Sequence, residues 1–388
     1  MKIAIFSECK SNNQGDQAIF RSVTSLLSDH ELVGISLSDE SPPKVIENSN
    51  YSRRLRDAKF IASFKLPMSR ARIRWYLQGA RSKSAIRYAQ GLENCDAAII
   101  GGGQLFRRNS NLFAERVYEI SNLCQERKIP YAILGVGIDS ALDTSSSRLL
   151  SKVLFRANYI CLRDALSRAR AKKMLGGTGN VEVGPDLAFA YTRNSFSRKF
   201  KEPSQRSTVF LNIMNYEQFT SRTYRKLNRN QFDMVSRWKA FAVAAIKAEL
   251  DIVICTSGVE GDLAVAQVVA QQIGDMAGCK IQVIHPTGLT EMEEALTRGG
   301  YILASRMHAG ILAYRFGLKV VAFDWDDKVS GCWETIGQPD CVYNFWDSDP
   351  SKVLSFLISR AVEDDYPPVA RKVEVAVKHC LEHLLSRI

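Results

Sequence analysis

Two residues of the sequence, Arg306 and His308, have types and spacing suited to binding an anion. They follow a short apolar run, Tyr301 to Ala304, that predicts a buried strand, and they open an apolar-periodic segment that predicts a helix with Ser305 as its N-cap. Ligands of open α/β sheets bind at the carboxyl ends of strands, and a helix N-terminus there favours anions. An arginine fork beside a titratable imidazole suits a phosphate or a carboxylate, although an exposed arginine with a half-buried histidine and no ligand fits the same spacing.

Other predicted strands also end in residues that suit a ligand. The apolar run 96–100 leads into Gly101, Gly102 and Gly103, followed by Gln104. Glycines after a strand let a ligand approach the backbone, and their N–H groups can cradle an anion, but a plain flexible turn has the same composition. Two further strand exits carry charged residues, namely Arg163 and Asp164 after 159–162, and Asp324, Asp326, Asp327 and Lys328 after 319–323.

A polar turn near the N-terminus joins the first predicted strand, Lys2 to Ser7, to a helix expected from about Gln17 to Leu27. This strand–loop–helix unit resembles the opening of a nucleotide-binding fold, but GxGxxG is absent, so the turn by itself is weak support for a ligand site. Its residues are Asn13, Gln14, Gly15, Asp16 and Gln17.

The length of 388 residues favours two domains, and strands alternate with helices through most of the chain. We therefore expect an α/β fold of two Rossmann-like domains facing across a cleft. The first is expected over 1–191, a polar, basic linker over 192–206, the second domain over 207–348 and closing helices over 349–388.

Composition excludes several classes of protein. No apolar run is long enough for a transmembrane helix, and the N-terminus is too short and polar for a signal peptide. The nine cysteines are scattered with no CxxC pair, which favours free, non-catalytic thiols in a reducing cytoplasm. His379 and His383 are too few ligands for zinc, so no metal site is expected.

The net charge of +11 is concentrated in residues 51–90, where eleven basic residues accompany one acidic residue, Asp57. Phe64, Trp75 and Tyr76 interleave with these charges. Such a mixture is typical of an amphipathic segment at an anionic membrane, and equally of a solvated helical face with ordinary core contacts. Binding of nucleic acid is a third option, but no zinc-finger or RNP-like motif supports it.

Taken in order, several of these segments resemble the polysaccharide pyruvyltransferase family. No single motif is specific, whereas the ordered set spans nearly the whole chain. The matching segments are Asn13 to Ala18 with a "GNxGDxA" signature, Gly101 to Leu105 with "GGGxL", Leu162 to Asp164 with "xRD", Gly184 to Phe189 with "DxAF", Ser305 to Ala309 with "SxRxH" (its serine one residue closer here), and Asp327 to Lys328 with a downstream "xxK".

The resemblance implies a glycosyltransferase-B-like fold and transfer of a pyruvyl group from phosphoenolpyruvate to two hydroxyls of a sugar. The products would be a cyclic ketal and phosphate, with phosphoenolpyruvate as donor substrate and no cofactor. It also implies that Arg306 and His308 act at the donor, with Arg163 a less certain match. Gln14 and Gln17 depart from the signature, and the missing carboxylate at position 17 puts an acid/base role there in doubt.

The chemistry of such a reaction explains why these residue types would be wanted. Phosphoenolpyruvate carries a carboxylate and a phosphate, for which we expect Arg306, Arg163, Lys328 and the glycines Gly102 and Gly103. Its enol needs a proton at C3, for which His308 is the candidate acid. Asp16 is the candidate base, and Asn13, Gln14, Gly15 and Gln104 are candidates for the acceptor side.

The partners expected are phosphoenolpyruvate, a sugar or lipid-linked oligosaccharide acceptor, and an anionic membrane surface contacted by residues 51–90. Nucleic acid is not expected. The enzyme would then be cytoplasmic, or peripheral on the inner face of the cell membrane. A glycosyltransferase that uses a nucleotide-sugar donor is the main alternative, since it would share the layout and the basic donor site. A non-catalytic nucleic-acid-binding protein would explain the charge but not the Gly, Arg and His residues at strand ends.

Overall fold

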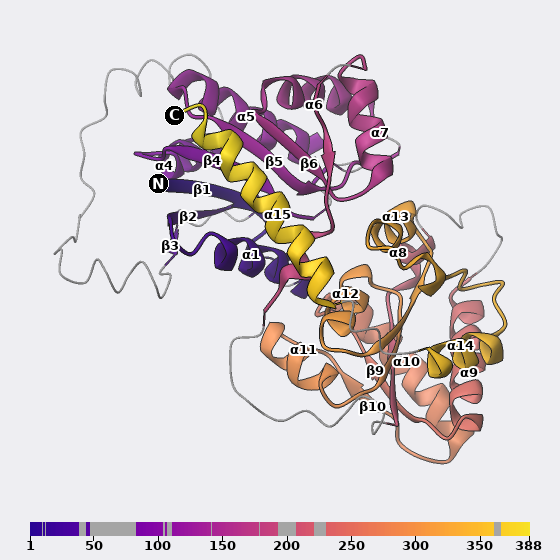
Figure 1. Ribbon diagram of the computed structural model, residues 1–388. Helices are drawn as coiled ribbons and strands as arrows, with labels where there is room; N and C mark the ends of the chain where they lie inside the picture. Colours follow the sequence, from indigo (N-terminus) through magenta and orange to yellow (C-terminus); the bar gives the residue numbers. More distant parts are fainter. Residues whose placement is uncertain are drawn as a thin grey trace, which may run out of the picture. The chain divides into compact units, whose positions relative to one another are not determined.

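The structure is a computed structural model of the 388-residue chain (Figure 1). It describes residues 1–9, 11, 13–38, 44–46, 83–103, 105–106, 111–140, 142–177, 179–192, 207–220, 230–360 and 366–388. Gln104, residues 193–206 of the expected linker and residues 51–82 of the basic segment lie outside this part of the chain. Arg87, which is described, is buried rather than presented to a membrane, and its guanidinium lies over the ring of Tyr88.

The chain forms two compact units, each assembled from separate stretches of sequence. The first unit contains residues 1–10, 20–184 and 374–388, and the second contains residues 11–19 and 185–373. This division differs from the expected boundary at residue 191. Residues 185–191 belong to the second unit because Tyr191 hydrogen-bonds Glu293 and accepts two bonds from Arg315 through its carbonyl oxygen.

A seven-stranded sheet forms the centre of the first unit, in the order β3-β2-β1-β4-β5-β6-β7. All neighbours are parallel except the edge strand β3, which is antiparallel to β2. Strands β1, β2, β4, β5 and β6 are almost entirely buried, as parallel strands covered by helices on both faces must be. Their bounds are β1 (Lys2–Ser7), β2 (Glu31–Ser36), β3 (Lys44–Ile46), β4 (Ala97–Gly101), β5 (Tyr131–Val136), β6 (Tyr159–Leu162) and β7 (Glu182–Val183).

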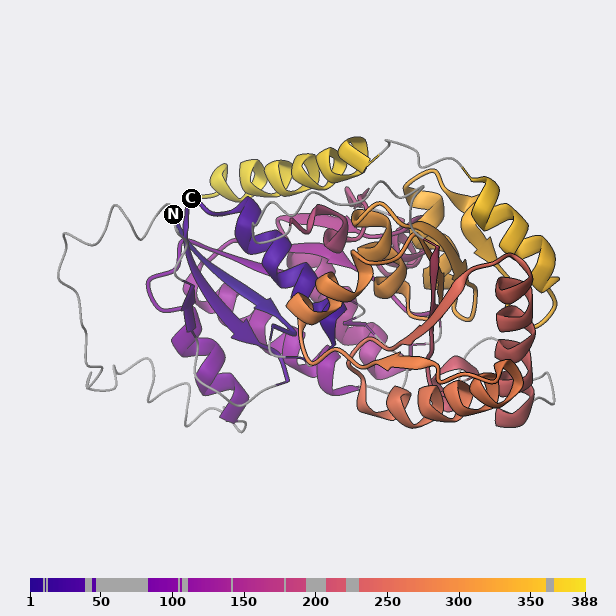
Figure 2. The same ribbon diagram turned by 90° about the horizontal axis from the view of Figure 1, so that it is seen from below.

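Helices cover both faces of this sheet (Figure 2). One side carries α4 (Lys83–Gly91) and α5 (Asn111–Arg127), and α4 packs Tyr88 against Phe6 of β1. The C-terminal part of α15 (Tyr366–Leu385) packs on β6, where His383 stacks on Tyr159. Two more helices, α6 (Thr144–Arg156) and α7 (Ala165–Met174), follow β5 and β6 in the chain.

The second unit contains a six-stranded, wholly parallel sheet in the order β10-β9-β8-β11-β12-β13. Counted from β8, this is the 3-2-1-4-5-6 order of a dinucleotide-binding fold. Successive strands are added on one side of β8 up to β10 and then on its other side from β11 on, so the strand order reverses between β8 and β11. The strand bounds are β8 (Thr208–Asn212), β9 (Asp251–Cys255), β10 (Gln282–Ile284), β11 (Tyr301–Ala304), β12 (Lys319–Phe323) and β13 (Val342–Tyr343).

An aromatic cluster fills the core of the second unit on one side of β12. Trp238 and Phe241 of α9 pack against Phe323 of β12 and against Phe345. The helices and turns of this unit are α8 (Tyr216–Thr220), α9 (Gln231–Lys247), α10 (Glu260–Ala277), α11 (Leu289–Leu296), α12 (Met307–Arg315), α13 (Asp327–Thr335) and α14 (Pro350–Ser359), with 3₁₀ turns at Leu187–Ala190 and Pro339–Cys341. The division between the units falls within α1 (Gln14–Leu26), whose first turn belongs to the second unit.

The prediction of two Rossmann-like α/β domains is confirmed. Several strands, including Lys2–Ser7, Tyr159–Leu162 and Lys319–Phe323, have the predicted bounds. Helix α13 was not predicted. Among the described helices, none is long and apolar enough to cross a membrane.

Candidate active site

Arg306, rather than the predicted Ser305, is the N-cap of helix α12. It has extended backbone angles and makes no side-chain cap bond, so its side chain is directed elsewhere. Ser305 instead connects the end of β11 to its neighbours through its backbone. Its N–H donates to the carbonyl oxygen of Asn212, and its own carbonyl accepts a 2.6 Å bond from the indole of Trp325. The helix therefore begins one residue later than the sequence predicts.

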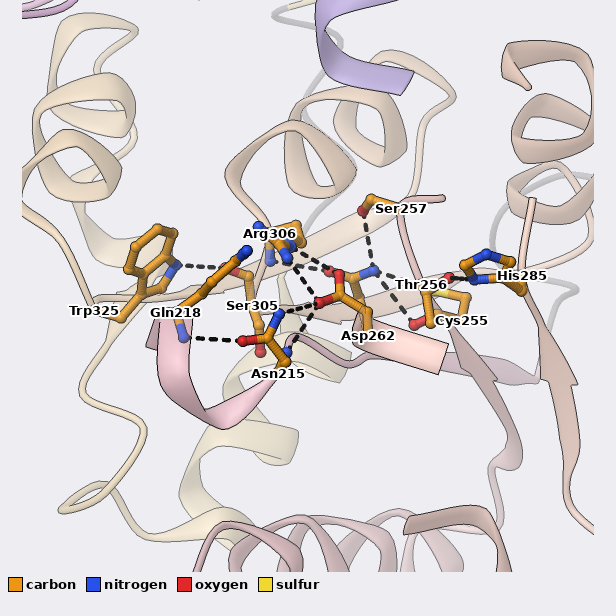
Figure 3. Close-up of polar contacts among 11 residues, drawn as sticks. Asn215, Gln218, Cys255, Thr256, Ser257, Asp262, His285, Ser305, Arg306 and Trp325 are labelled. Atoms are coloured by element: carbon orange, nitrogen blue, oxygen red, sulfur yellow. Dashed lines mark hydrogen bonds and ion pairs between the residues drawn. The ribbon is translucent and has the colours of Figure 1, made fainter. Parts of the chain in front are cut away.

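The guanidinium of Arg306 is held from one side by Asp262, in the first turn of α10 (Figure 3). Its Nε lies 2.9 Å from one carboxylate oxygen and its Nη2 lies 2.7 Å from the other, a bidentate pair. The Asp262 side chain is fully buried, whereas 16% of the Arg306 side chain is exposed. The pair occupies the Nε–Nη2 edge, so the Nη1–Nη2 end is the part of the fork that remains for a ligand.

Two asparagines hold this ion pair in place. Asn212, at the end of β8, accepts a 2.9 Å bond from the backbone N–H of Arg306. Asn215 donates to Asp262 from its backbone and from its side chain, at 3.0 and 3.1 Å. Because Asn212 ends β8 and Arg306 follows β11, the arginine lies at the point where the strand order reverses, the usual ligand position in such sheets.

His308 faces a second buried carboxylate. Its Nε2 lies 3.6 Å from Oδ2 of Asp186, whose side chain is fully buried. The other oxygen of Asp186 accepts a bond from the backbone N–H of Ala188 and so caps the 3₁₀ turn Leu187–Ala190. This arrangement directs Nε2 toward Asp186, so Nδ1 is the ring nitrogen that faces away from that carboxylate.

Gly15, at the start of α1, lies directly against the imidazole of His308 within the second unit. A Cβ at position 15 would fall on the ring atoms Cγ and Nδ1, so only glycine permits this approach. The polar N-terminal turn and the Arg306–His308 segment are thus brought together, although they are almost three hundred residues apart in the sequence.

The neighbours of Gly15 fix the rest of the turn. Gln14 is buried and donates a 2.8 Å bond to the carbonyl oxygen of Pro286. Asn13 accepts a bond from the N–H of Gly15, and Gln17 donates to the carbonyl oxygen of Ser11. An ionised glutamate could not donate that last bond, which explains how glutamine at position 17 suits this turn. These residues, expected on the acceptor side of the first domain, therefore belong to the second unit beside His308.

The remaining candidates of the second unit lie at the starts of two helices. Asp16 is half-buried in the first turn of α1, next to Gly15. Lys328 lies in the first turn of α13, with its ammonium 4.3 Å from the centre of the Trp325 ring. Since the indole of Trp325 is bonded to Ser305, Lys328 is positioned on the strand end that also carries Arg306.

Asp324, at the exit of β12, has an unusual protonation equilibrium. Burial, together with the nearby charges of Asp326, Asp327 and Glu334, raises the pKa of its carboxyl to about 6. A carboxyl with this pKa changes charge close to neutral pH. The acidic residues after this strand therefore do not form a uniformly charged loop.

In the first unit, the triple glycine follows β4, also beside the reversal of strand order. Gly102 and Gly103 have positive φ angles, which glycine adopts without strain. However, the N–H of Gly102 donates to the carbonyl oxygen of Leu134, and the carbonyl of Gly103 accepts from Gly137. Fewer backbone N–H groups are therefore left to bind an anion than expected, because that of Gly102 is already bonded to the neighbouring strand.

Arg163 does not have the exposure that a donor-binding arginine needs. Only 1% of its surface is exposed, its guanidinium packs against Gly137, and its Nε lies 3.5 Å from the carboxylate of Asp164. Asp164 in turn caps α7 by accepting a bond from the N–H of Ser167. In this structure Arg163 joins β5, β6 and α7 inside the first unit.

Sequence reasoning singled out Arg306 and His308 but gave no role to the residues that hold them. Asp186 was within a noted segment, whereas Asp262 was not, and the pairing of Asp262 with Arg306 and of Asp186 with His308 depends on contacts across 44 and 122 positions of sequence. Asn212 and Asn215 were not singled out either. Asp262 lies in the first turn of the helix after β9, and Asp186 follows β7 of the other sheet, so no shared strand end marked these pairs in the sequence.

Comparison with solved structures supports the fold. The chain resembles UDP-GlcNAc 2-epimerase from Methanocaldococcus jannaschii, with 12% identity, a TM-score of 0.55 and 94% of each chain covered. It also resembles UDP-GlcNAc 2-epimerase from Neisseria meningitidis, with 13% identity, a TM-score of 0.52 and 100% of each chain covered. A glycosyltransferase from Rickettsia africae ESF-5 gives 11% identity and a TM-score of 0.50, with 99% of this chain and 96% of the other covered. At such identities the likeness shows the fold alone, which is that of glycosyltransferase-B proteins.

A search of curated proteins gives no match. The family model described as polysaccharide pyruvyl transferase, in contrast, matches residues 13–327. The match begins in the turn that contacts His308 and ends in the first turn of α13, so it includes Asp186, Asp262, Arg306 and His308 and stops one residue before Lys328. The chain belongs to the polysaccharide pyruvyl transferase family.

Proposed function

We propose that this protein transfers the pyruvyl group of phosphoenolpyruvate to two hydroxyls of a sugar in a lipid-linked glycan, forming a cyclic ketal and releasing phosphate. The observation that carries the proposal is the start of α12, directly after β11, where Arg306 pairs with the buried carboxylate of Asp262 and Nε2 of His308 lies 3.6 Å from the buried carboxylate of Asp186. A family member needs a cationic group for the donor's anions and a proton donor for its enol, and these two side chains supply both.

Arg306 would bind the carboxylate or phosphate of the donor. Asp262 fixes the guanidinium by its Nε–Nη2 edge, so the Nη1–Nη2 end meets the anion without losing side-chain freedom on binding. The charge of Asp262 offsets part of the arginine's charge, and therefore the second cation, Lys328, would contribute to holding the leaving phosphate. The uncapped N-terminus of α12 adds a favourable dipole.

His308 would act as the general acid through Nδ1. Protonation of C3 converts the donor's methylene to a methyl group and leaves an electron-poor C2, which one sugar hydroxyl attacks. The second hydroxyl then attacks C2, the bond from C2 to the phosphate oxygen breaks, and the ketal closes. Of the two hydroxyl protons, one replaces the proton given to C3 and the other leaves with phosphate. Asp186 acts as a positioning residue, because it holds Nε2 and so fixes which ring edge meets the substrate.

Asp16 would orient or deprotonate an acceptor hydroxyl. It follows Gly15, whose backbone touches the imidazole, so the candidate base and the candidate acid lie on adjacent chain segments. Proximity of this kind allows one sugar to contact both groups. Gly102 and Gly103 of the first unit stay predictions for binding phosphoenolpyruvate, and Gln104, which lies outside the described residues, stays a prediction for the acceptor.

The direct test is phosphate release from phosphoenolpyruvate. The purified protein is incubated with phosphoenolpyruvate and a panel of lipid-linked and soluble glycans, and phosphate and a pyruvate ketal on the glycan are both measured. Equal amounts of the two products support the proposal. Failure to bind phosphoenolpyruvate and to release phosphate with every glycan would remove it.

The second candidate is a glycosyltransferase that uses a nucleotide-sugar donor. The observation in its favour is the fold, because one structural neighbour was solved with UDP-GlcNAc bound. The same protein preparation should then release the nucleoside diphosphate from a nucleotide sugar. Consumption of a nucleotide sugar without any use of phosphoenolpyruvate would favour this candidate.

The proposal includes a place in the cell: the cytoplasm, with peripheral attachment to the inner face of the membrane where a lipid-linked acceptor would be anchored. Its support is the basic stretch 51–90, whose cations other than the buried Arg87 would each contribute about 1 kcal/mol near an anionic bilayer. Co-sedimentation with anionic vesicles at low salt tests it, as set out below with the variants that locate the contact.

A further inference from the structure

Helices α6 and α7 of the first unit carry an unbalanced positive charge. They are neighbours in space (Figure 1). Their sequences contain no acidic residue, whereas three basic residues lie in α6 and four in α7. These are Arg148, Lys152 and Arg156 in α6, and Arg168, Arg170, Lys172 and Lys173 in α7. We call this pair of helices the α6–α7 face.

Apolar side chains are exposed on the same two helices. Phe155 of α6 has 81% of its surface exposed, and Leu166 of α7 has 42% exposed. Arg148, Lys152, Lys172 and Lys173 are exposed as well. On α6, positions 148, 152 and 155 follow the helical spacing of one stripe, in which Phe155 lies one turn from Lys152 and two turns from Arg148.

The α6–α7 face is held rigidly. Asp143 caps α6 and Asp164 caps α7, each by accepting a backbone N–H of the first turn. Arg156 donates a 2.7 Å bond to Asn122 of α5, and Arg170 donates to the carbonyl oxygen of Ile138. A surface fixed in this way loses little conformational freedom on binding, so it can serve as a docking platform.

The acidic residues around the face do not cancel its charge. Asp164 is buried, and Asp143 lies at the start of α6, away from Phe155 and Lys172. Hydrogen bonds from Ser145 and Ser146 hold the pKa of Asp143 at about 2, so this carboxylate is committed to its cap. Glutamates lie on the adjoining α5 and on β7, where Glu182 accepts a bond from Tyr159.

We propose that the α6–α7 face docks the protein on an anionic lipid surface. Lysines and arginines around exposed phenylalanine and leucine fit the interface of a bilayer, where cations meet lipid phosphates and the apolar side chains enter the acyl boundary. A nucleic acid would satisfy the cations but would give no general reason for Phe155 and Leu166 to be exposed together. The proposal does not depend on pyruvyl transfer, because docking needs no substrate.

The test is co-sedimentation of the full-length protein with vesicles of phosphatidylglycerol and phosphatidylcholine, compared with phosphatidylcholine alone. Lys172→Ala with Lys173→Ala should lower the partition coefficient about 25-fold, since each cation near such a surface contributes about fivefold. Phe155→Ser should lower it severalfold without changing charge. The matched control is Phe232→Ala with Lys247→Ala, which removes an aromatic side chain exposed to 83% and an exposed lysine of α9 and should leave partitioning unchanged.

Two comparisons decide the outcome. A variant with Arg70, Arg72 and Arg74 changed to Glu alters only the N-terminal basic stretch. If this variant loses vesicle binding while the α6–α7 variants keep it, the α6–α7 proposal is overturned. It is also overturned if the protein binds duplex DNA more tightly than anionic vesicles, or if Phe155→Ser has no effect. Loss of vesicle binding in the α6–α7 variants, with phosphate release on a soluble acceptor retained, supports the proposal and separates it from the reaction.

Discussion

Arg163 and Arg306 lie in the same local setting, but Arg163 is buried and Arg306 is partly exposed. Each follows a buried strand and precedes a helix at the carboxyl edge of a parallel sheet. Arg163 is almost completely buried and packs on Gly137, whereas Arg306 is partly exposed and is held from one side by Asp262. A strand–Arg–helix pattern therefore does not by itself identify a ligand-binding arginine.

The difference comes from where the countercharge lies. The partner of Arg163 is its neighbour Asp164, so the pair stays at its own strand end within the core of the first unit. The partner of Arg306 comes from another helix and approaches one edge of the guanidinium, which leaves the opposite end for a ligand. A carboxylate partner can thus fix an arginine inside the protein or orient it toward a ligand, depending on the direction of approach.

Substitution of His308 should give the largest effect on activity, because no residue of the first unit is expected to take over its role as the general acid. We expect His308→Gln to retain binding of phosphoenolpyruvate and to lower turnover by about 10²–10⁴-fold, the usual contribution of general acid catalysis. Calorimetry and phosphate release measure the two quantities. The control is His30→Gln in the first unit. Near-normal turnover of His308→Gln would eliminate His308 as the acid.

Arg306 should affect binding of the donor more than the rate. Arg306→Lys and Arg306→Ala should both lose about 2–4 kcal/mol of transition-state stabilisation, because lysine keeps the charge but lacks the fork. The dissociation constant of phosphoenolpyruvate, measured by calorimetry, should rise in both. Arg298→Ala, at an exposed position of the same unit, is the matched control. A lysine variant with wild-type affinity would mean that charge alone is needed.

Arg163 should show the opposite behaviour, with a loss of stability and no loss of donor affinity. Arg163→Met leaves Asp164 buried without its cation, which should lower the free energy of unfolding by about 3–5 kcal/mol. Arg168→Met, exposed on α7, should change it by less than about 0.5 kcal/mol. Chemical denaturation and calorimetry decide the matter. If Arg163→Met remains stable but loses phosphoenolpyruvate binding, Arg163 belongs to the donor site after all.

Asp324 should make the stability of the protein depend on pH near neutrality. Its pKa is raised from 3.8 to about 6 in the folded protein, so the folded state holds a proton more tightly than the unfolded state. The contribution of this carboxyl to the free energy of unfolding is fully present below about pH 4 and is lost as the pH rises through about 6. Asp324→Asn should therefore raise the melting temperature by about 2–4 °C above pH 6 and have no effect below pH 4. An equal effect at all pH values would contradict this account.

The smallest effect is expected for the cysteines. Burial raises the pKa of Cys95 to about 11 and those of Cys124, Cys161 and Cys255 to about 12, so these thiols should not react near neutral pH. Cys279 is exposed. Iodoacetamide at pH 8 should label Cys279 first and leave most phosphate release intact, as mass spectrometry and the activity assay would show. Complete inactivation after a single modification would contradict the prediction that no cysteine is catalytic.

The sequence by itself determined the alternation of strands and helices, the two Rossmann-like domains and the family. These features depend on hydrophobic periodicity and on short motifs such as the one around Arg306 and His308, which are local properties of the chain. It also predicted the strand end that carries both residues, because strand exits are marked by the change from apolar to polar residues.

Only the tertiary structure decided which of these residues can work together. Asp262 orients Arg306, Asp186 faces His308, and Gly15 meets the imidazole, all through contacts between distant positions. Burial of Arg163 likewise depends on its packing between β5, β6 and α7 and not on its motif. Burial, direction of approach and countercharge are properties of the assembled sheets, and a single sequence contains no local signal for them.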